Sequence, residues 1–252
     1  MVANKTSGLG DAFWVDGYDL SGDIGSLSSI HGGPAALELT GINKSAPERV
    51  GGLRDGGIEF SAWFDPGTAQ SHPVLAALPT GDRIATYAHQ PGLGIGAQCA
   101  CVVGKQINYD GNRGQDGSFP LSTSVQANNY GLEWGDLLTV GTNGVRTDTT
   151  ATNGASLDFG ATSTLFGGQA YLQVFSVTGT SVTVKLQDSA DNSTFADITG
   201  AAFIAATGRG SQRLQLASNA TVRRYVRAVT TGTFTNAQFA VVFVRNLVAT
   251  VF

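Results

Sequence analysis

The chain has 252 residues, enough for one large domain or two of ordinary size with a substantial core. Charged residues make up only 13% and glycine occupies 34 positions, which suits an all-β protein that has many tight turns and buries surface against other subunits. No apolar run approaches the roughly 18 residues of a membrane span, and the first residues lack a secretory signal, so we expect a cytosolic product without membrane insertion.

The net charge of −4 hides an asymmetry along the chain. Up to Asp158 there are 8 Lys and Arg against 16 Asp and Glu, a balance of −8, whereas the remainder has 7 against 3, a balance of +4. Such a split suggests two domains with different surroundings. Residues 139–156 are rich in Thr, Gly and Asn and lack sustained periodicity. We therefore predict a first domain over 1–145, a linker over 146–156 and a second domain over 157–252.

Two alternating runs near the start predict strands of an antiparallel sheet with one face on a core. In the first run, Leu37 and Leu39 alternate with Glu38 and Thr40. In the second run, residues 58–65, every even position is apolar, which is the clearest alternation in this part of the chain.

The loop between these runs concentrates charge in a low-charge chain. Its glycines and Pro47 deny it regular structure. An ordinary surface loop would explain it. The alternative is an assembly loop that pairs an arginine with an acid of a neighbouring copy, where charge sets specificity and register more than affinity. The candidate inter-subunit residues are Lys44, Glu48, Arg49, Arg54 and Asp55.

Residues 71–79 are the strongest helix candidate. Ser71 can cap the first turn, Pro73 suits a first-turn position and Pro79 ends the segment. The helix would be only about two turns long. The first domain is therefore expected to be a β-sandwich or barrel with one short helix.

Alternating or apolar runs after the linker predict further short strands. They cover residues 181–187, 213–216, 222–229 and 239–246, with turn-rich segments between them. This spacing is typical of an Ig-like or jelly-roll-like β-sandwich. The expected fold class is all-β throughout.

No motif favours an enzyme, a cofactor or a metal site. The three histidines lie in different segments without paired spacing. The glycines of residues 92–96 lack the flanking strand and helix of a dinucleotide-binding loop, and residues 110–116 lack the closing glutamate of a calcium loop. Cys99 and Cys101 share a strand face, which suits buried apolar residues better than a disulfide.

The second domain contains the candidate outer-surface residues. Arg223 and Arg227 fall on one face of a regular strand, which is compatible with contacts to phosphate or glycan, or with a solvated or inter-subunit face. Asp188 and Asp191 lie in a predicted surface turn, for which an ion site is the alternative.

The whole chain resembles the tail tube (major tail) proteins of long-tailed, non-contractile bacteriophages, particularly those of actinobacterial hosts. The resemblance is strongest in GYDLSGDIGSLSSI, LTGINKSAPERVGGLRDGGIEFSAWFD, HPVLAALPTGDRIATY and VGKQINYDGNRGQDGSF. The part from SVTVKLQDSADNSTFADI onward resembles the added sandwich domain of many such proteins.

This resemblance implies a structural virion protein that is assembled in the host cytoplasm. Tail tube proteins stack as rings, usually hexameric, into a hollow tube, with the added domain outside. Their partners are copies of themselves, the tape-measure protein and the tail terminator and distal tail proteins. Double-stranded DNA passes through the lumen without specific binding. A capsid or decoration protein, or a carbohydrate-binding module for host attachment, is the alternative.

The acidic first domain agrees with a channel for DNA, because an acidic wall repels phosphates whereas a basic wall would hold them. We predict that some of the following candidate acids face the lumen: Asp16, Asp19, Asp23, Glu38, Glu59 and Asp65.

Overall fold

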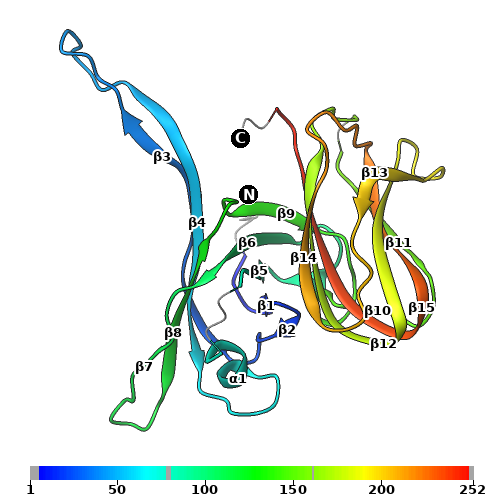
Figure 1. Ribbon diagram of the computed structural model, residues 1–252, viewed down its shortest axis with the longest axis horizontal. Coiled ribbons are helices and arrows are strands. Elements are labelled where there is room, and N and C mark those ends of the chain that lie inside the picture. Colours follow the sequence, from blue (N-terminus) through cyan, green and yellow to red (C-terminus); the bar gives the residue numbers. More distant parts are fainter. Residues whose placement is uncertain (1–5, 78–80, 161, 250–252) are drawn as a thin grey trace. The chain divides into compact units, whose positions relative to one another are not determined.

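The computed structural model describes residues 6–77, 81–160 and 162–249. Across these residues it has fifteen β-strands, one α-helix and two short 3-10 helices, which confirms the all-β prediction (Figure 1). The chain divides into two compact units. Unit 1 consists of Met1–Gly22, Thr86–Cys101 and Trp134–Phe252, and unit 2 consists of Asp23–Ala85 and Val102–Glu133.

Two long strands form the framework of unit 1. β12 (Gly168–Ser189) and β15 (Tyr225–Arg245) pair antiparallel from end to end. The register shifts near Gly179, and bulges of this kind bend a strand. Gly179 and Gly232 have φ values of 131° and 121°, which other residues rarely adopt. A Cβ at Gly232 would also lie only 2.4 Å from the carbonyl oxygen of Ser181, so the bend requires glycine there.

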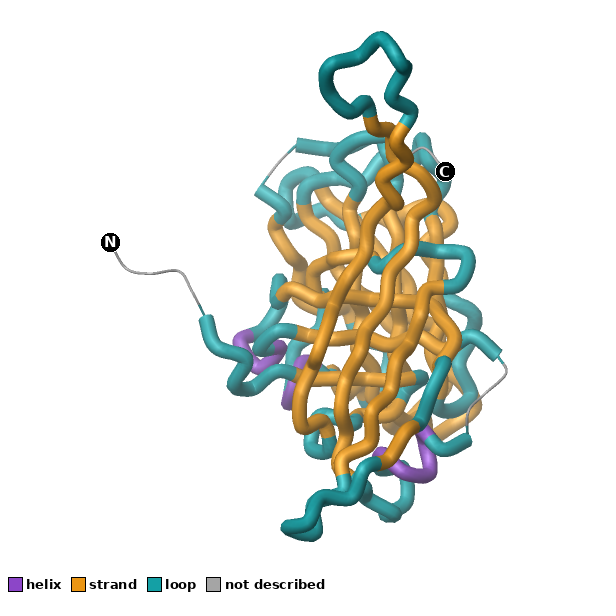
Figure 2. Tube along the Cα trace, turned by 90° about the vertical axis from the view of Figure 1, so that its left-hand side faces the viewer, coloured by secondary structure: helices purple, strands orange, loops and turns teal. Residues whose placement is uncertain are grey.

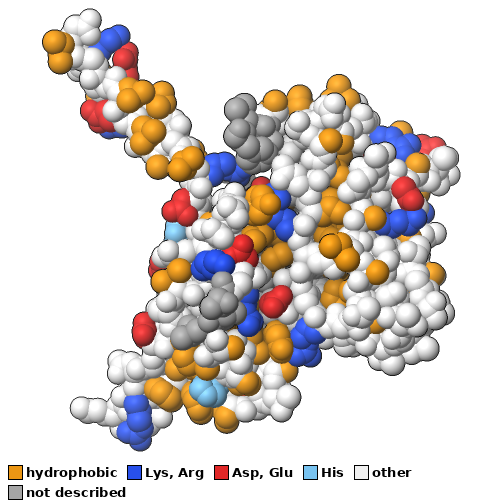
Figure 3. Space-filling view, in the orientation of Figure 1, with side chains coloured by type: hydrophobic (Ala, Val, Ile, Leu, Met, Phe, Trp, Pro, Cys, Tyr) orange, Lys and Arg blue, Asp and Glu red, His pale blue; other side chains and the backbone are white. Residues whose placement is uncertain are grey.

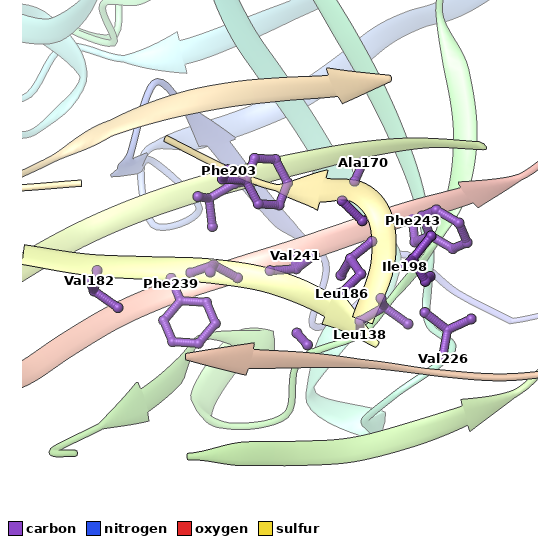
Figure 4. Close-up of a cluster of buried hydrophobic side chains, with 14 of the residues drawn as sticks. Leu138, Ala170, Val182, Leu186, Ile198, Phe203, Val226, Phe239, Val241 and Phe243 are labelled. Atoms are coloured by element: carbon purple, nitrogen blue, oxygen red, sulfur yellow. The ribbon is translucent and has the colours of Figure 1, made fainter. Parts of the chain in front are cut away.

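Shorter strands flank this framework on both sides. β9 (Glu133–Leu137), β10 (Arg146–Asp148) and β11 (Asn153–Asp158) pair with β15, while β13 (Ala196–Ala202) and β14 (Gly210–Gln215) pair with β12. Apolar residues from both halves of the two long strands meet in one core, shown in Figure 4. Leu172 and Val184 come from the two halves of β12, and Val226 and Val241 from those of β15. The predicted C-terminal sandwich core is therefore present.

The remaining strands of unit 1 include those in which the chain passes from one unit to the other. They are β1 (Ala12–Val15), β2 (Tyr18–Asp19), β5 (Arg83–Ala88) and β6 (Gln98–Gln106). The 3-10 helix η1 (Pro91–Leu93) lies between β5 and β6, and η2 (Thr142–Gly144) lies between β9 and β10. The boundaries between the units at 85/86, 101/102 and 133/134 fall inside β5, β6 and β9. Both buried cysteines lie in β6, as expected for small apolar residues.

The prediction that residues 146–156 form a linker is wrong. Residues 146–156 contain β10 and most of β11, both paired with β15. Arg146 is buried and donates to both carboxylate oxygens of Asp148 at 2.8 and 2.7 Å and to the Ala228 carbonyl at 2.9 Å. Polar composition indicates a loop here, but the structure forms strands because these polar groups find partners within the fold. The division into a tube domain and an exterior domain stays a prediction.

Unit 2 is built on an antiparallel sheet. Its strands run in the order β3 (Ile24–Glu38), β4 (Arg49–Trp63) and β8 (Pro120–Ala127), with β7 (Asp110–Gly111) and the end of β6 beyond β8. Ile58, Phe60 and Ala62 of β4 are buried, as the alternation predicts. Leu121 and Val125 of β8 are buried on the same face, opposite Ala62 and Ile58.

The one α-helix, α1 (Ser71–Leu75), ends earlier than residue 79, the predicted end, and Pro79 lies outside the described residues. Ser71 is its first residue rather than its cap. The Ser71 N–H is satisfied by the Asp23 carboxylate at 2.7 Å, and the Leu75 carbonyl accepts from Gln106 Nε2 at 2.7 Å. Within the described part of the chain, no helix is long and apolar enough to cross a membrane.

Candidate assembly surface

β3 and β4 continue beyond the rest of the sheet of unit 2 as a two-stranded ribbon (Figure 1). Figure 2 turns this sheet toward the viewer, with the ribbon tip beyond it. β8 flanks β4 only over residues 57–63, so residues 32–56 have no third strand beside them in the described chain. We call residues 32–56 the distal ribbon. Its tip is the loop 39–48.

The distal ribbon has one apolar and one polar face. Leu37 pairs with Val50, and cross-strand partners share a face; Leu39, two residues along, lies on it too. Glu38 pairs with Arg49 on the opposite face. The alternation that predicts a strand here is thus confirmed, but the core predicted under its apolar face is wrong for this part of the described chain.

The apolar side chains of the ribbon are open to solvent. The exposed fraction lies between 48% and 109% for Leu37, Leu39, Ile42, Val50 and Leu53. Soluble monomers rarely expose contiguous apolar patches, and such patches mark interaction surfaces. The charges of this loop, on which the predicted assembly contact rests, do not reveal the apolar surface. The sequence signal for it is the alternation of apolar residues at Leu37 and Leu39.

All the predicted inter-subunit charges lie on the distal ribbon: Lys44, Glu48, Arg49, Arg54 and Asp55. Several are already paired within it. Lys44 Nζ is 2.8 Å from Glu48 Oε1, and Arg49 is 3.8 Å from the Glu38 carboxylate. Asp55 accepts from the Gly56 N–H at 2.7 Å. A role for these charges between copies stays a prediction.

The base of the ribbon is a glycine neck, where Gly32 pairs with Gly56. Leu132 packs against both strands at this point. A Cβ at Gly56 would lie 2.6 Å from Leu132 Cβ, and one at Gly32 would lie 2.9 Å from it. Gly33, the next residue of β3, has a φ of 138°. Glycine is required here because Leu132 and the two backbones approach so closely.

A second apolar surface lies at the opposite end of β4. We call Phe64, His72, Tyr109 and Phe119 the aromatic patch; the exposed Trp63 lies on the other face of β4, the face that carries Ser61. Phe64 lies 4.5 Å from the His72 ring and 5.3 Å from the Phe119 ring, centroid to centroid. His72 Nδ1 is 2.7 Å from the Tyr109 hydroxyl, and partial burial raises the pKa of Tyr109.

Trp63, Phe64 and Phe119 remain 37% to 49% exposed. The predicted placement of Phe64 on a core is therefore wrong, because the strand ends at Trp63 and the chain turns toward α1. Figure 3 shows hydrophobic side chains gathered along the ribbon and again at the other end of unit 2, around a histidine.

One face of the sheet of unit 2 is polar. The register places these residues on it, away from the buried face: Ser26, Ser29, Glu59, Ser61, Ser122, Ser124 and Gln126. A groove of about 440 Å³ crosses it, and its lining includes Glu59, Asn108 and Ser124. The face is rich in hydroxyl and amide groups.

The predicted lumen acids do not gather on one surface. Glu59 alone among them lies on the polar face just described. Asp23 is buried as the partner of the Ser71 N–H, so its predicted exposure to a channel is wrong. Asp65 accepts from the Gly67 N–H, and Glu38 is on the distal ribbon. Asp16 and Asp19 belong to unit 1, where Asp16 accepts from the Ser211 hydroxyl.

The predicted outer-surface residues also separate. Asp188 is only 4% exposed, because the Arg223 N–H and guanidinium both donate to it at 2.7 Å, so its prediction as a surface residue is wrong. Arg227 donates to Gln187 and lies 3.9 Å over the Phe195 ring.

Asp191 is exposed, as expected for a surface turn. Backbone N–H groups, first that of Thr194, and the Ser189 hydroxyl hold its pKa at about 2. The described residues contain no cluster of three or more His, Cys, Asp or Glu side chains suited to a metal ion.

No protein-family model matches the sequence, and no curated protein matches it. Among solved structures, the chain is similar to the Dit protein of phage SPP1, described as a paradigm of the hub adsorption apparatus in phages that infect Gram-positive bacteria. The sequences are 12% identical, the TM-score is 0.34, and the match covers 94% of this chain and 99% of that chain. A likeness of this size carries no argument about function.

Proposed function

We propose that the protein is a structural component of a phage tail that assembles with copies of itself into stacked rings, forming the tail tube through which DNA is delivered. The proposal rests on the sequence resemblance and on one structural observation, the open border of unit 2. No catalytic role is proposed.

That open border is β3. Its 15 residues pair with β4 on one side and with no other strand in the described chain. An exposed edge of this length offers a row of backbone donors and acceptors to another chain. Pairing between neighbouring copies would satisfy them and close the sheets into a ring. The register shifts along β3 favour the curvature that a closed barrel needs.

In such a ring, we assign the lumen to the polar face that contains Glu59. Hydroxyl and amide groups offer DNA no ion pairs, and Glu59 repels its phosphates. Lys105, which lies opposite Gln126 on this face, is paired with Asp82 at 2.8 Å. The channel would therefore let DNA slide, although with fewer acids than the charge of the first 158 residues suggests. The tape-measure protein would occupy the same channel before DNA passes. The tail terminator and distal tail proteins would cover the ends of the tube.

Negative-stain electron microscopy of the purified full chain at increasing concentration tests this function. Hollow tubes are the expected result. A protein that remains monomeric at all concentrations would contradict it. Binding as knobs on phage shells would favour the decoration alternative, and retention on glycan arrays without tubes would favour the carbohydrate-binding alternative.

A further inference from the structure

We infer that the apolar face of the distal ribbon docks onto the aromatic patch of a second copy of this chain. This inference rests on the proposed function and deepens it, because it names both surfaces of one contact between copies. It differs from the charge pairing expected from the sequence.

The two surfaces lie at opposite ends of one strand. Val50 and Trp63, which directly precedes Phe64 of the patch, are separated by 13 positions of β4, so at about 3.3 Å per residue they lie about 40 Å apart. They cannot meet within one chain. A contact that joins two different surfaces of successive copies is heterologous, and repetition along one direction gives an open filament.

The chemistry of the two surfaces is complementary. The ribbon offers branched aliphatic side chains such as Leu39 and Val50, and the patch offers the faces and edges of Phe64 and Phe119. Burial of both is favourable in proportion to the apolar area removed from water. Burying a charge would cost free energy unless it was paired, and the nearest ribbon charges already have partners in the same ribbon, such as Glu38 for Arg49.

The apolar surface of the ribbon is also extensive. It comprises Leu37, Leu39, Ile42, Val50 and Leu53, each at least 48% exposed, and exposed apolar patches of this kind mark interaction surfaces. An apolar surface of this size at the end of an unsupported ribbon is exposed only in the isolated chain. A second copy supplies its cover without any further protein.

A direct consequence is the spacing of copies along the filament. If the tip of one copy reaches the patch of the next, the axial repeat is the projection of this distance onto the tube axis. The tubes should therefore show a repeat of at most about 40 Å, shortened by the tilt of β4 in a closed barrel and by its curvature.

The first test replaces the apolar face. The double variant Leu39→Ser/Val50→Ser should raise the protein concentration needed for tube formation by about tenfold or more, since two large side chains no longer leave water. Both residues are exposed, so circular dichroism and thermal melting should be unchanged.

The matched control changes the opposite face of the same ribbon. Glu38→Gln/Arg49→Gln removes the pair of charges there and should change the required concentration by less than about twofold. The reverse result, with the control impaired and the serine variant normal, would overturn the inference in favour of contacts through charge.

A second test locates the contact. Ile42→Cys and Phe119→Cys are prepared as separate variants, mixed, assembled and treated with a short bismaleimide. Cys99 and Cys101 are both 0% exposed, so they should not compete for the reagent. A cross-linked dimer that contains one of each variant is expected.

The outcomes distinguish the two proposals. Tubes that form normally but yield no mixed cross-link would overturn the docking inference and leave the proposed function standing. Absence of tubes from the unmodified protein at every concentration would overturn both.

Discussion

At the scale of single residues, the glycine neck sets the position of the distal ribbon. Gly56 lies where Leu132 approaches both strands, and a methyl group there would overlap Leu132. Gly56→Ala should destabilise unit 2 by about 1–3 kcal/mol, the usual cost of overpacking. Chemical denaturation measures this. Gly22→Ala, where no atom lies within 4 Å of the added Cβ, is the control and should change little.

Acid sensitivity also belongs to single residues. Asp158 lies 2.6 Å from Arg224 Nε, and this guanidinium, with the Gly160 N–H, lowers the pKa of Asp158 to about 2. Its unfolded value is near 3.9, so the stabilisation is present above about pH 4 and is lost as the pH falls toward 2. Asp158→Asn should therefore lower the melting temperature slightly at pH 6 but not at pH 2. Calorimetry that finds the same difference at both pH values would contradict this.

At the scale of elements, the buried ion pair of β10 holds a strand that composition did not reveal. Asp148→Ala leaves the Arg146 guanidinium buried without its carboxylate, which should cost about 3–5 kcal/mol of unfolding free energy. The control is Asp197→Ala, which removes a more exposed ion pair to Lys185 and should cost about 0–1 kcal/mol. Equal losses of unfolding free energy for the two variants in urea denaturation would show that burial does not increase the contribution of an ion pair to stability.

Removal of the distal ribbon should leave the rest of the chain folded. Replacing residues 33–55 by Asn-Gly, which favours a tight hairpin turn, removes no buried residue. We expect the melting temperature to stay within a few degrees, because no core residue is lost. Tube formation should disappear in electron micrographs. Normal tubes from this variant would exclude the ribbon from assembly.

Sequence periodicity predicts strands well but does not say what covers them. The run at residues 58–65 predicts buried Ile58 and Phe60 correctly, because the core lies within the same unit. The same pattern at Leu37 and Leu39 predicts the strand and its two faces, yet nothing in the described chain covers the apolar one. A period of two residues shows only that one face avoids water.

A different reason explains why the polar strands and the buried acids could not be predicted. Arg146 and Asp148 are read as surface residues because burial of charge is rare, and only their partners in space make it tolerable. Asp23 likewise reads as a surface acid in the sequence, because only the fold brings the Ser71 N–H of α1 beside it. The bond from Arg146 to the Ala228 carbonyl and the bond from Ser71 to Asp23 join residues far apart in the sequence, where composition gives no signal.

At the scale of the whole molecule, neither unit is one continuous segment. A fragment of residues 157–252 retains β12 to β15 but loses β9, β10 and most of β11, which pair with β15. We expect it to be poorly folded, with weak dispersion of its NMR signals. A fragment of residues 134–252 restores these pairings and should be better ordered. A well-folded 157–252 fragment would show that the predicted boundary describes an independent domain.

The uncovered leucines and valine of the distal ribbon also bear on how temperature and solvent would govern the particle. An assembly held by apolar burial is driven by the entropy of water, so it weakens on cooling and strengthens in sulfate solutions. Ordinary changes in ionic strength would have little influence, since the neighbouring charges already neutralise one another in each subunit. Filaments made of this protein should therefore dissociate in the cold and persist in brine.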